Sequence, residues 1–314
     1  MREWLLSFSK NSRNQEFKKS SILILLLFLI LGGLAFAQGQ VESPPERIIS
    51  LSPSITEILY GIGAFDRVVA VSDYCEYPPE VEKLPRVGAW MNTNIEQVAS
   101  LEPDLIIMND AQAPFIQDRL DALGLASLVV PSQTLADIFE AIETIGRAVS
   151  NVEEAKLLAS ETRGILEEVR DKTKDLRRPR VLTVVDRLPG TLRDLYVATH
   201  GSYLIEVVEI AGGVPIAPNA AMGYTRISTE AVISYDPDVI LDIAQTVSNA
   251  VTLLRGSGLE EDPIAVWSEL SDVKAVQDER VYPLSNKLIV HPSQFVGDSV
   301  LRIARILHPE VFEN

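Results

Sequence analysis

The strongest constraint on the fold is a fourteen-residue segment that occurs twice. Residues 94–107 align without a gap with residues 228–241, at a constant offset of 134 positions. Each copy has the pattern of a short helix, a Pro-Asp turn and an apolar strand. This duplication predicts two equivalent lobes, although helix-Pro-Asp-strand is also a common local arrangement. The identical pairs are Glu96/Glu230, Val98/Val232, Ser100/Ser234, Pro103/Pro237, Asp104/Asp238 and Ile106/Ile240.

Short apolar runs alternate with helical patterns throughout the chain. Nearly continuous apolar strands between helices predict mainly parallel sheets that are covered on both faces. The fold class we expect is therefore α/β, with two doubly wound lobes. The expected strands are 47–51, 68–71, 105–108, 128–130, 181–185 and 239–241, and the clearest helices are 55–60, 115–123 and 201–211.

A single long helix is expected over residues 151–177. Asn151 with Glu154 three positions later is an N-cap pattern, and no proline follows until Pro179. Such a helix spans roughly 40 Å, so it is either a long surface helix of one domain or a strut between two domains. The repeat favours the strut. Its apolar stripe should be Ala155, Leu158, Thr162, Ile165, Val169, Thr173 and Leu176. The expected segments are a lead-in at 38–46, lobes at 47–150 and 179–314, and the helix at 151–178.

The N-terminus has the pattern of a secretory signal peptide. A basic lead precedes an apolar run of 16 residues at 22–37, which ends in Ala35-Phe36-Ala37. This run is shorter than the roughly 20 residues of a spanning helix, so we expect cleavage after Ala37, with an uncleaved membrane anchor as the alternative. Cys75 is the one cysteine, which excludes an intrachain disulfide and leaves no lipid acceptor at the cleavage site. An exported chain without a lipid is expected in the periplasm.

Composition and motifs indicate a protein that is not an enzyme. The formal charge of −16 argues against nucleic acid or an anionic membrane as the main partner. The sequence has no G-x-S-x-G elbow, P-loop or G-x-G-x-x-G motif. All three histidines lie in the second half, so a metal site that bridges the lobes through histidines is not expected. We therefore expect no catalytic residue, no resident metal and no cofactor.

Several motifs in the first half of the chain carry a family resemblance. They are Asp73-Tyr-Cys-Glu-Tyr-Pro-Pro-Glu80, Arg86-Val-Gly-Ala-Trp90 and Asn94-Ile-Glu96. In this order they resemble the periplasmic cobalamin-, haem- and ferric-siderophore-binding proteins of ABC importers, over about residues 45 to 309. That family has two α/β lobes joined by one long helix. The resemblance implies a monomeric protein that binds a ligand between its lobes and delivers it to an inner-membrane permease dimer.

The resemblance gives the repeated glutamates a role in docking. In the family, one exposed glutamate of each lobe meets arginines of the two permease subunits, and the matching residues are Glu96 and Glu230. The alternative is helix-terminus chemistry, because Thr93 and Glu96 form a capping-box pattern. Glu230 has Ile227 three positions before it, which weakens capping as the common cause.

Aromatic residues match the positions where the cobalamin-type members hold their ligand. The matching residues are Tyr74, Trp90 and Tyr224, and large flat ligands are bound by aromatic faces with a few polar anchors. Ordinary packing is the alternative for Tyr74 and Trp90. Polar pairs also follow two expected strands, where open α/β sheets bind ligands. They are Asn109 with Asp110 and Asp186 with Arg187, which could instead cap loops.

The last candidates leave the ligand open. Arg226 and Lys287 could bind anionic groups of a ligand or be solvated charges. His291 lies where the family has late contacts, and Asn286 stands where cobalamin-type members have an acidic residue. His291 or a cleft tyrosine could ligate haem iron. We expect a corrinoid-binding protein, with a haem or ferric-siderophore carrier, a chelatase-like enzyme or a membrane-anchored receptor as alternatives.

Overall fold

The computed structural model describes residues 43–220, 223–244, 263–284 and 291–312. Residues 44–314 form one compact unit, and the account below concerns that unit. The expected signal peptide and the segment with Asn286 and Lys287 lie outside the described residues. Within the described part of the chain, no helix is both long and apolar enough to cross a membrane.

The first lobe is built on a four-stranded parallel sheet. Its strand order is β2-β1-β3-β4, and every neighbouring pair is parallel, as predicted. The strands are β1 (Ile48–Ser50), β2 (Val68–Val71), β3 (Leu105–Asn109) and β4 (Ser127–Val130). The helices are α2 (Pro53–Gly61), α3 (Ile95–Ser100), α4 (Ala113–Ala122) and α5 (Leu135–Ala148), with 3₁₀ turns η1 (Phe65–Arg67) and η2 (Pro79–Lys83).

The second lobe contains a mixed sheet. Strands β7, β5, β9 and β10 are parallel and repeat the order of the first sheet, whereas β6 and β8 add an antiparallel edge beside β5. The strands are β5 (Arg180–Asp186), β6 (Leu195–Ala198), β7 (Val214–Pro215), β8 (Tyr224–Ile227), β9 (Val239–Asp242) and β10 (Val281–Pro283). The helices are α7 (Tyr203–Ile210), α8 (Thr229–Tyr235), α10 (Pro263–Trp267), α11 (Lys274–Gln277), α12 (Val296–Leu307) and α13 (Pro309–Phe312), with η3 (Ser268–Leu270).

The repeated Pro-Asp turn makes the same contacts in both lobes. The Asp104 carboxylate accepts a hydrogen bond from the Arg47 amide at 2.9 Å, and Asp238 accepts one from the Arg180 amide at 2.8 Å. In each lobe the aspartate amide donates to the carbonyl of the same arginine, at 2.9 Å. The residue two positions before each aspartate has a left-handed backbone, with φ of 46° and 42°. In each lobe the aspartate thus holds the start of the first strand, β1 or β5, beside the strand that belongs to the repeat, β3 or β9.

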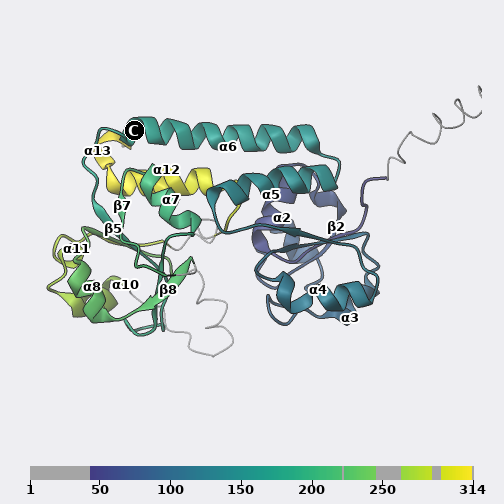
Figure 1. The fold of residues 1–314 in the computed structure, drawn as a ribbon, viewed down its shortest axis with the longest axis horizontal. Helices are drawn as coiled ribbons and strands as arrows, with labels where there is room; N and C mark the ends of the chain where they lie inside the picture. Colours follow the sequence, from purple (N-terminus) through teal and green to yellow (C-terminus); the bar gives the residue numbers. More distant parts are fainter. Residues whose placement is uncertain (1–42, 221–222, 245–262, 285–290, 313–314) are drawn as a thin grey trace, which may run out of the picture. The chain divides into compact units, whose positions relative to one another are not determined.

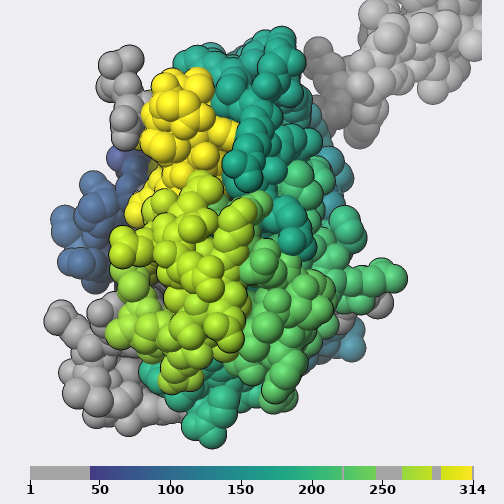
Figure 2. Space-filling model, turned by 90° about the vertical axis from the view of Figure 1, so that its left-hand side faces the viewer, coloured from purple at the N-terminus to yellow at the C-terminus, as the bar shows by residue number. Residues whose placement is uncertain are grey.

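Helix α6 (Val152–Thr173) is the predicted long helix, and it contacts elements of both lobes. Figure 1 shows α5 beneath one half of α6, and α12 and α7 beneath the other half. In Figure 2 the yellow C-terminal residues lie against the teal residues of α6. The predicted stripe is right at four positions, but Ala159 and Leu166 are buried where Leu158 and Ile165 were expected. The buried residues are Ala155, Ala159, Thr162, Leu166, Val169 and Thr173.

The predicted side-chain cap at the start of α6 is wrong. Asn151 precedes the helix, but its side chain makes no capping hydrogen bond. Its amide donates instead to the carbonyl of Ile62 at 2.8 Å, and its oxygen accepts from Arg67 at 2.5 Å. Asn151 therefore ties the start of α6 to the residues that follow α2.

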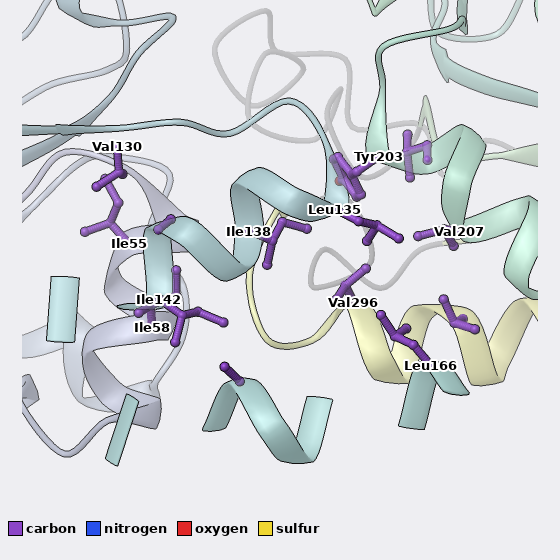
Figure 3. Packing of buried hydrophobic residues seen from close by; sticks show 14 of the residues in the cluster. Ile55, Ile58, Val130, Leu135, Ile138, Ile142, Leu166, Tyr203, Val207 and Val296 are labelled. Atoms are coloured by element: carbon purple, nitrogen blue, oxygen red, sulfur yellow. The ribbon is translucent and has the colours of Figure 1, made fainter. Parts of the chain in front are cut away.

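One hydrophobic core cluster extends through both lobes. It contains Ile55 of α2, Leu135 of α5, Leu166 of α6, Val207 of α7 and Val296 of α12. Figure 3 shows these side chains as a continuous group that runs from α2 and α5 towards α7 and α12. The lobes are thus joined by packed apolar surface as well as by the connecting helix.

The N-termini of α5 and α7 meet and cap each other. The Leu135 amide donates to the Glu206 carboxylate at 2.7 Å, and the Tyr203 amide donates to the Gln133 carbonyl at 2.6 Å. An acidic group is favoured beside the free amides of a helix N-terminus. This joint satisfies polar groups at the place where the two lobes touch.

Two glycines test how closely α6 is packed. A Cβ atom on Gly146 of α5 would lie 2.3 Å from the Ala155 Cβ, whereas nothing lies within 4 Å of a Cβ on Gly164. We expect Gly146→Ala to destabilise the protein by about 1–3 kcal/mol through overpacking. Gly164→Ala should stabilise it by about 0.5–1 kcal/mol, because alanine is the better helix former. Urea unfolding measures both changes, and equal effects would contradict the close packing of α5 on α6.

Candidate functional site

Polar side chains of the first lobe form a hydrogen-bonded rim at the C-terminal edge of its sheet. Asn109 ends β3 and donates to the Ser52 hydroxyl, which follows β1, at 2.9 Å. Asp110 accepts a hydrogen bond from Ser132, which follows β4, at 2.8 Å. Asn109 and Asp110 are both half-buried. The topology therefore gathers Asn109 and Asp110 at the edge where open α/β sheets bind ligands.

The equivalent edge of the second lobe is built differently. The Arg187 side chain is 1% exposed, and its Nε lies 3.0 Å from an Asp242 carboxylate oxygen that also accepts from Trp267 Nε1 at 2.8 Å. This arrangement favours a structural role for Arg187. Asp186 is half-buried, and burial raises the pKa of its carboxyl while the amide and the charge of Arg187 oppose that shift. Asp186 is thus the residue of this pair that a ligand could reach.

Large aromatic rings are exposed at the three predicted positions. Tyr74, Trp90 and Tyr224 are 40%, 43% and 45% exposed, which is more than core packing leaves. Burial raises the pKa of the Tyr224 hydroxyl, which is also hydrogen-bonded to the Ser202 side chain. Tyr224 therefore exposes part of its ring while its polar end is held.

The loop that carries Trp90 has a fixed conformation. The buried Gln112 side chain donates to the Trp90 carbonyl at 3.1 Å. Gly88 has a φ of +98°, and a Cβ atom there would lie 2.7 Å from the Asn92 carbonyl oxygen. The Trp90 ring lies 6.3 Å from the ring of Phe115, which is 50% exposed. Phe115 was not predicted as a site residue, because only the tertiary fold brings its helix beside Trp90.

His291 contacts the first lobe through Glu57, a residue for which the sequence predicts no role in the site. His291 Nδ1 lies 2.6 Å from Glu57 Oε1, and the Ser293 hydroxyl donates to Glu57 Oε2 at 2.6 Å. The Gln294 amide donates to the Glu57 carbonyl at 2.8 Å. Glu57 lies on α2 and is 1% exposed. In the sequence Glu57 is an acidic residue within a mainly apolar helix. Its partner lies 234 residues away, so no local pattern indicates the contact.

The two predicted docking glutamates occupy equivalent positions. Glu96 is the second residue of α3 and Glu230 is the second residue of α8, and both are exposed. Asn94 and Ser228 are the N-caps, and their side chains accept backbone hydrogen bonds at 3.1 Å and 3.3 Å. The hydrogen bond with Ser228 is the main cause that holds the pKa of Glu230 below its usual value. Both lobes thus present an acid at the start of a short helix.

The predicted capping box of Thr93 and Glu96 is wrong. Asn94 is the N-cap of α3, and Thr93 is buried one position earlier. The Thr93 hydroxyl donates to the Ala89 carbonyl at 3.3 Å and thereby closes the Trp90 loop. The Asn94 side chain caps this helix, so Glu96 is not required as a capping residue.

The remaining features lie elsewhere. Arg226 is exposed on β8 and forms an ion pair with Asp194.

A cavity of about 440 Å³ lies at the end of α6 and contains none of the predicted ligand residues. Its cationic side chains lie near the C-terminal ends of α6 and α7, where they offset the helix dipoles, so we assign it no ligand. It is lined by Arg170, Thr173, Lys174, Arg178, Glu209, Ile210 and Gly212.

The two arginines of the second lobe should respond differently to substitution. Arg187→Met leaves the buried Asp242 carboxylate without its cation, and we expect a loss of about 3–5 kcal/mol in the free energy of unfolding. Arg226→Met removes an exposed pair and should cost less than about 1 kcal/mol. Denaturant unfolding measures both. A stable Arg187→Met protein that no longer binds its ligand would instead make Arg187 a ligand contact.

Comparison with known proteins agrees with this architecture. A family model described as "Periplasmic binding protein" matches residues 48–288. The vitamin B12-binding protein of Vibrio cholerae is 29% identical over 265 residues, which cover 84% of this chain and 90% of that protein. An uncharacterized ABC transporter substrate-binding lipoprotein of Bacillus subtilis is 28% identical over 281 residues, covering 87% of this chain and 83% of the relative.

Solved structures agree as well. The periplasmic vitamin B12-binding protein of V. cholerae has a TM-score of 0.70 and 28% identity, and covers 85% of this chain and 98% of its own. A periplasmic haem-binding protein from Pseudomonas aeruginosa has a TM-score of 0.73 at 22% identity, with 85% and 94% covered, and shows the shared fold. The chain therefore belongs to the periplasmic binding protein family, as an ABC transporter substrate-binding protein of the group with vitamin B12-, haem- and siderophore-binding members.

Proposed function

We propose that this protein binds a corrinoid of the vitamin B12 type and delivers it to an ABC importer. The supporting observation is the 29% identity to a vitamin B12-binding protein over 90% of that protein's length. The exposed rings of Tyr74, Trp90 and Tyr224 suit a large ligand with flat faces. Asn109, Asp110 and Asp186 at the strand ends supply polar anchors.

A haem or ferric-siderophore ligand is the second candidate. Haem-binding proteins share the fold, and His291 offers an imidazole that the corrinoid assignment does not require. The relatives are substrate-binding proteins and not enzymes, which supports a carrier over a chelatase-like role. Both candidates place a metal-centred macrocycle or chelate in the same region.

We propose that the lobes move little when the ligand binds. The shared core cluster and the capped joint of α5 and α7 would have to be exposed if the lobes separated. The boundaries of the lobes at 47–150 and 179–314 belong to this proposal, with α6 as the connection. A nearly fixed spacing would keep Glu96 and Glu230 matched to a permease of two-fold symmetry.

The docking proposal is tested by reversing charge. Glu96→Arg and Glu230→Arg together should abolish uptake into cells and leave the ligand affinity unchanged, because both side chains are exposed at helix starts. Glu161→Arg, an exposed acid on α6, is the matched control and should leave uptake unchanged. Normal uptake by the double variant would contradict the docking role.

We propose that residues 1–37 are removed during export and that the mature protein is periplasmic. The B. subtilis relative is a lipoprotein, whereas the one cysteine here, Cys75, is fully buried and hydrogen-bonded to Ser72 and Thr56. A lipid on that thiol would require unfolding of the first lobe. The uncleaved anchor remains the alternative.

Native mass spectrometry of the protein from its source reports both the mature N-terminus and the bound ligand. We expect a chain that begins at residue 38 and carries a corrinoid.

Visible-light titration with cobalamin, hemin and a ferric siderophore should show saturation by cobalamin. Trp90→Ala should weaken that binding roughly tenfold through the loss of about 1.4 kcal/mol, whereas Leu157→Ala, at an exposed position of α6, should not. Saturation by hemin alone would reject the corrinoid, and an intact Met1 would reject cleavage.

A further inference from the structure

Phe115 lies at the edge of the first sheet where polar side chains of the proposed site gather. It is the third residue of α4, the helix that follows β3. The Gln112 amide donates to the Asn109 carbonyl at 3.0 Å, and the Phe115 amide donates to the Gln112 carbonyl at 3.0 Å. These two turns hold the start of α4 close to the strand end that carries Asn109 and Asp110. Phe115 is thereby placed at the C-terminal edge of the sheet, where open α/β sheets bind ligands.

The loop that carries Trp90 reaches the same edge from the outer strand. Arg86 forms a parallel bridge with Val71, the last residue of β2, so the chain continues past the C-terminal end of that strand. The Gln112 side chain then donates to the Trp90 carbonyl at 3.1 Å. The Trp90 loop therefore extends from the end of β2 to the start of α4.

The rings of Trp90 and Phe115 touch each other and remain open to solvent. Their centroids are 6.3 Å apart and their planes are inclined by 61°. Trp90 is 43% exposed and Phe115 is 50% exposed. A single exposed apolar side chain is ordinary on a protein surface, so neither exposure alone indicates a site. The contact, however, joins the two rings into one angled apolar surface, the aromatic corner of Trp90 and Phe115.

The angle between the rings determines how a flat molecule fits the aromatic corner. A planar ring system that stacks on one ring cannot be parallel to the other, because the two planes differ by 61°. The Trp90 indole offers the larger face for stacking. A flat ligand stacked there meets Phe115 with its edge, and a macrocycle carries its substituents at its edge. Aromatic rings form favourable contacts in both the stacked and the edge-to-face arrangement.

We propose that Phe115 is a specificity-determining residue of the ligand site, against which the apolar edge of a flat ligand packs while its face stacks on Trp90. This inference rests on the proposed function. The selected chemistry is a macrocycle with methyl or other alkyl groups at its periphery, which gain free energy when they leave water. A charged substituent against the phenyl ring would lose its hydration without gaining a hydrogen bond.

A supporting role, in which Phe115 only holds the Trp90 ring, predicts a different result once Trp90 is removed. If Phe115 acts only through Trp90, Phe115→Ala has no effect on affinity in a Trp90→Ala protein. If Phe115 contacts the ligand, Phe115→Ala weakens binding in both backgrounds. A double-mutant cycle therefore separates direct contact from support.

The first measurement is a visible-light titration of the full chain with cobalamin and, in parallel, with hemin. Phe115→Ala should weaken binding of the saturating probe by about threefold to tenfold, in the unaltered and in the Trp90→Ala background. Phe115→Leu keeps an apolar side chain and should lose less. Leu123→Ala is the matched control, because Leu123 is also exposed but lies at the other end of α4.

The second measurement uses Phe115→Asp, which puts a carboxylate where the apolar edge of the ligand would pack. It should weaken binding by a further factor of about ten relative to Phe115→Ala, since the carboxylate would be desolvated. The variant should still fold, because Phe115 is half exposed and an acidic residue is favourable in the first turn of a helix. Equal affinities of the alanine, leucine and aspartate variants would contradict a contact with the ligand.

Other occupants of the aromatic corner give other results. If the permease covers it, Phe115→Ala lowers uptake into cells and leaves the ligand affinity unchanged. If a second copy of the chain covers it, the unaltered protein sediments as a dimer that Phe115→Ala dissociates. Either result overturns the inference.

The outcomes also separate this inference from the proposed function. A saturating probe whose affinity is unchanged in Phe115→Ala, or a loss that disappears in the Trp90→Ala background, overturns the inference and leaves the proposed function standing. Failure of the unaltered protein to bind cobalamin, hemin or a ferric siderophore overturns both.

Discussion

The buried face of α6 is the constraint on which the rest of the structure depends. Its stripe packs on α5 at one end and on α12 and α7 at the other. A Cβ atom on Gly146 of α5 would lie 2.3 Å from Ala155, and one on Gly297 of α12 would lie 3.2 Å from Ile165, so glycine allows both helices to approach α6 closely. Because one core cluster runs through this face into both lobes, the lobes cannot separate without exposing apolar surface to water. This supports the proposal that the lobes move little when a ligand binds.

Polar groups at the lobe junction make this association specific. Glu206, which is half-buried, and Glu57, which is buried, both accept hydrogen bonds from the opposite lobe, and the buried Glu57 carboxylate cannot lose its partners at small cost. Apolar packing alone would tolerate small shifts between the lobes, whereas these hydrogen bonds require one arrangement. The contact between His291 Nδ1 and Glu57 Oε1, at 2.6 Å, is one of these links between the lobes.

The lobes share a scaffold but differ where a ligand would bind. The turns fixed by Asp104 and Asp238 are alike, and so is the order of the four parallel strands. At the strand ends the symmetry is lost. Met108 of the first lobe corresponds to Asp242 of the second, and the buried aspartate brings with it Arg187 and Trp267. At its strand ends the first lobe therefore has an amide and carboxylate rim, whereas the second has a buried ion pair with the half-buried Asp186 beside it.

The sequence by itself determined the local and periodic features: the strands of the first sheet, the long helix and the equivalence of Glu96 and Glu230. These follow from patterns within a few turns of chain, where propensity and periodicity act. Only the tertiary structure decided that Arg187 is buried, that Asn151 bonds to Arg67 rather than capping α6, and that Phe115 lies beside Trp90. It alone paired Glu57 with His291, because that contact closes a loop of 234 residues whose ends carry no shared pattern. Side-chain partners at such separations depend on how helices pack, and packing is a property of the whole core.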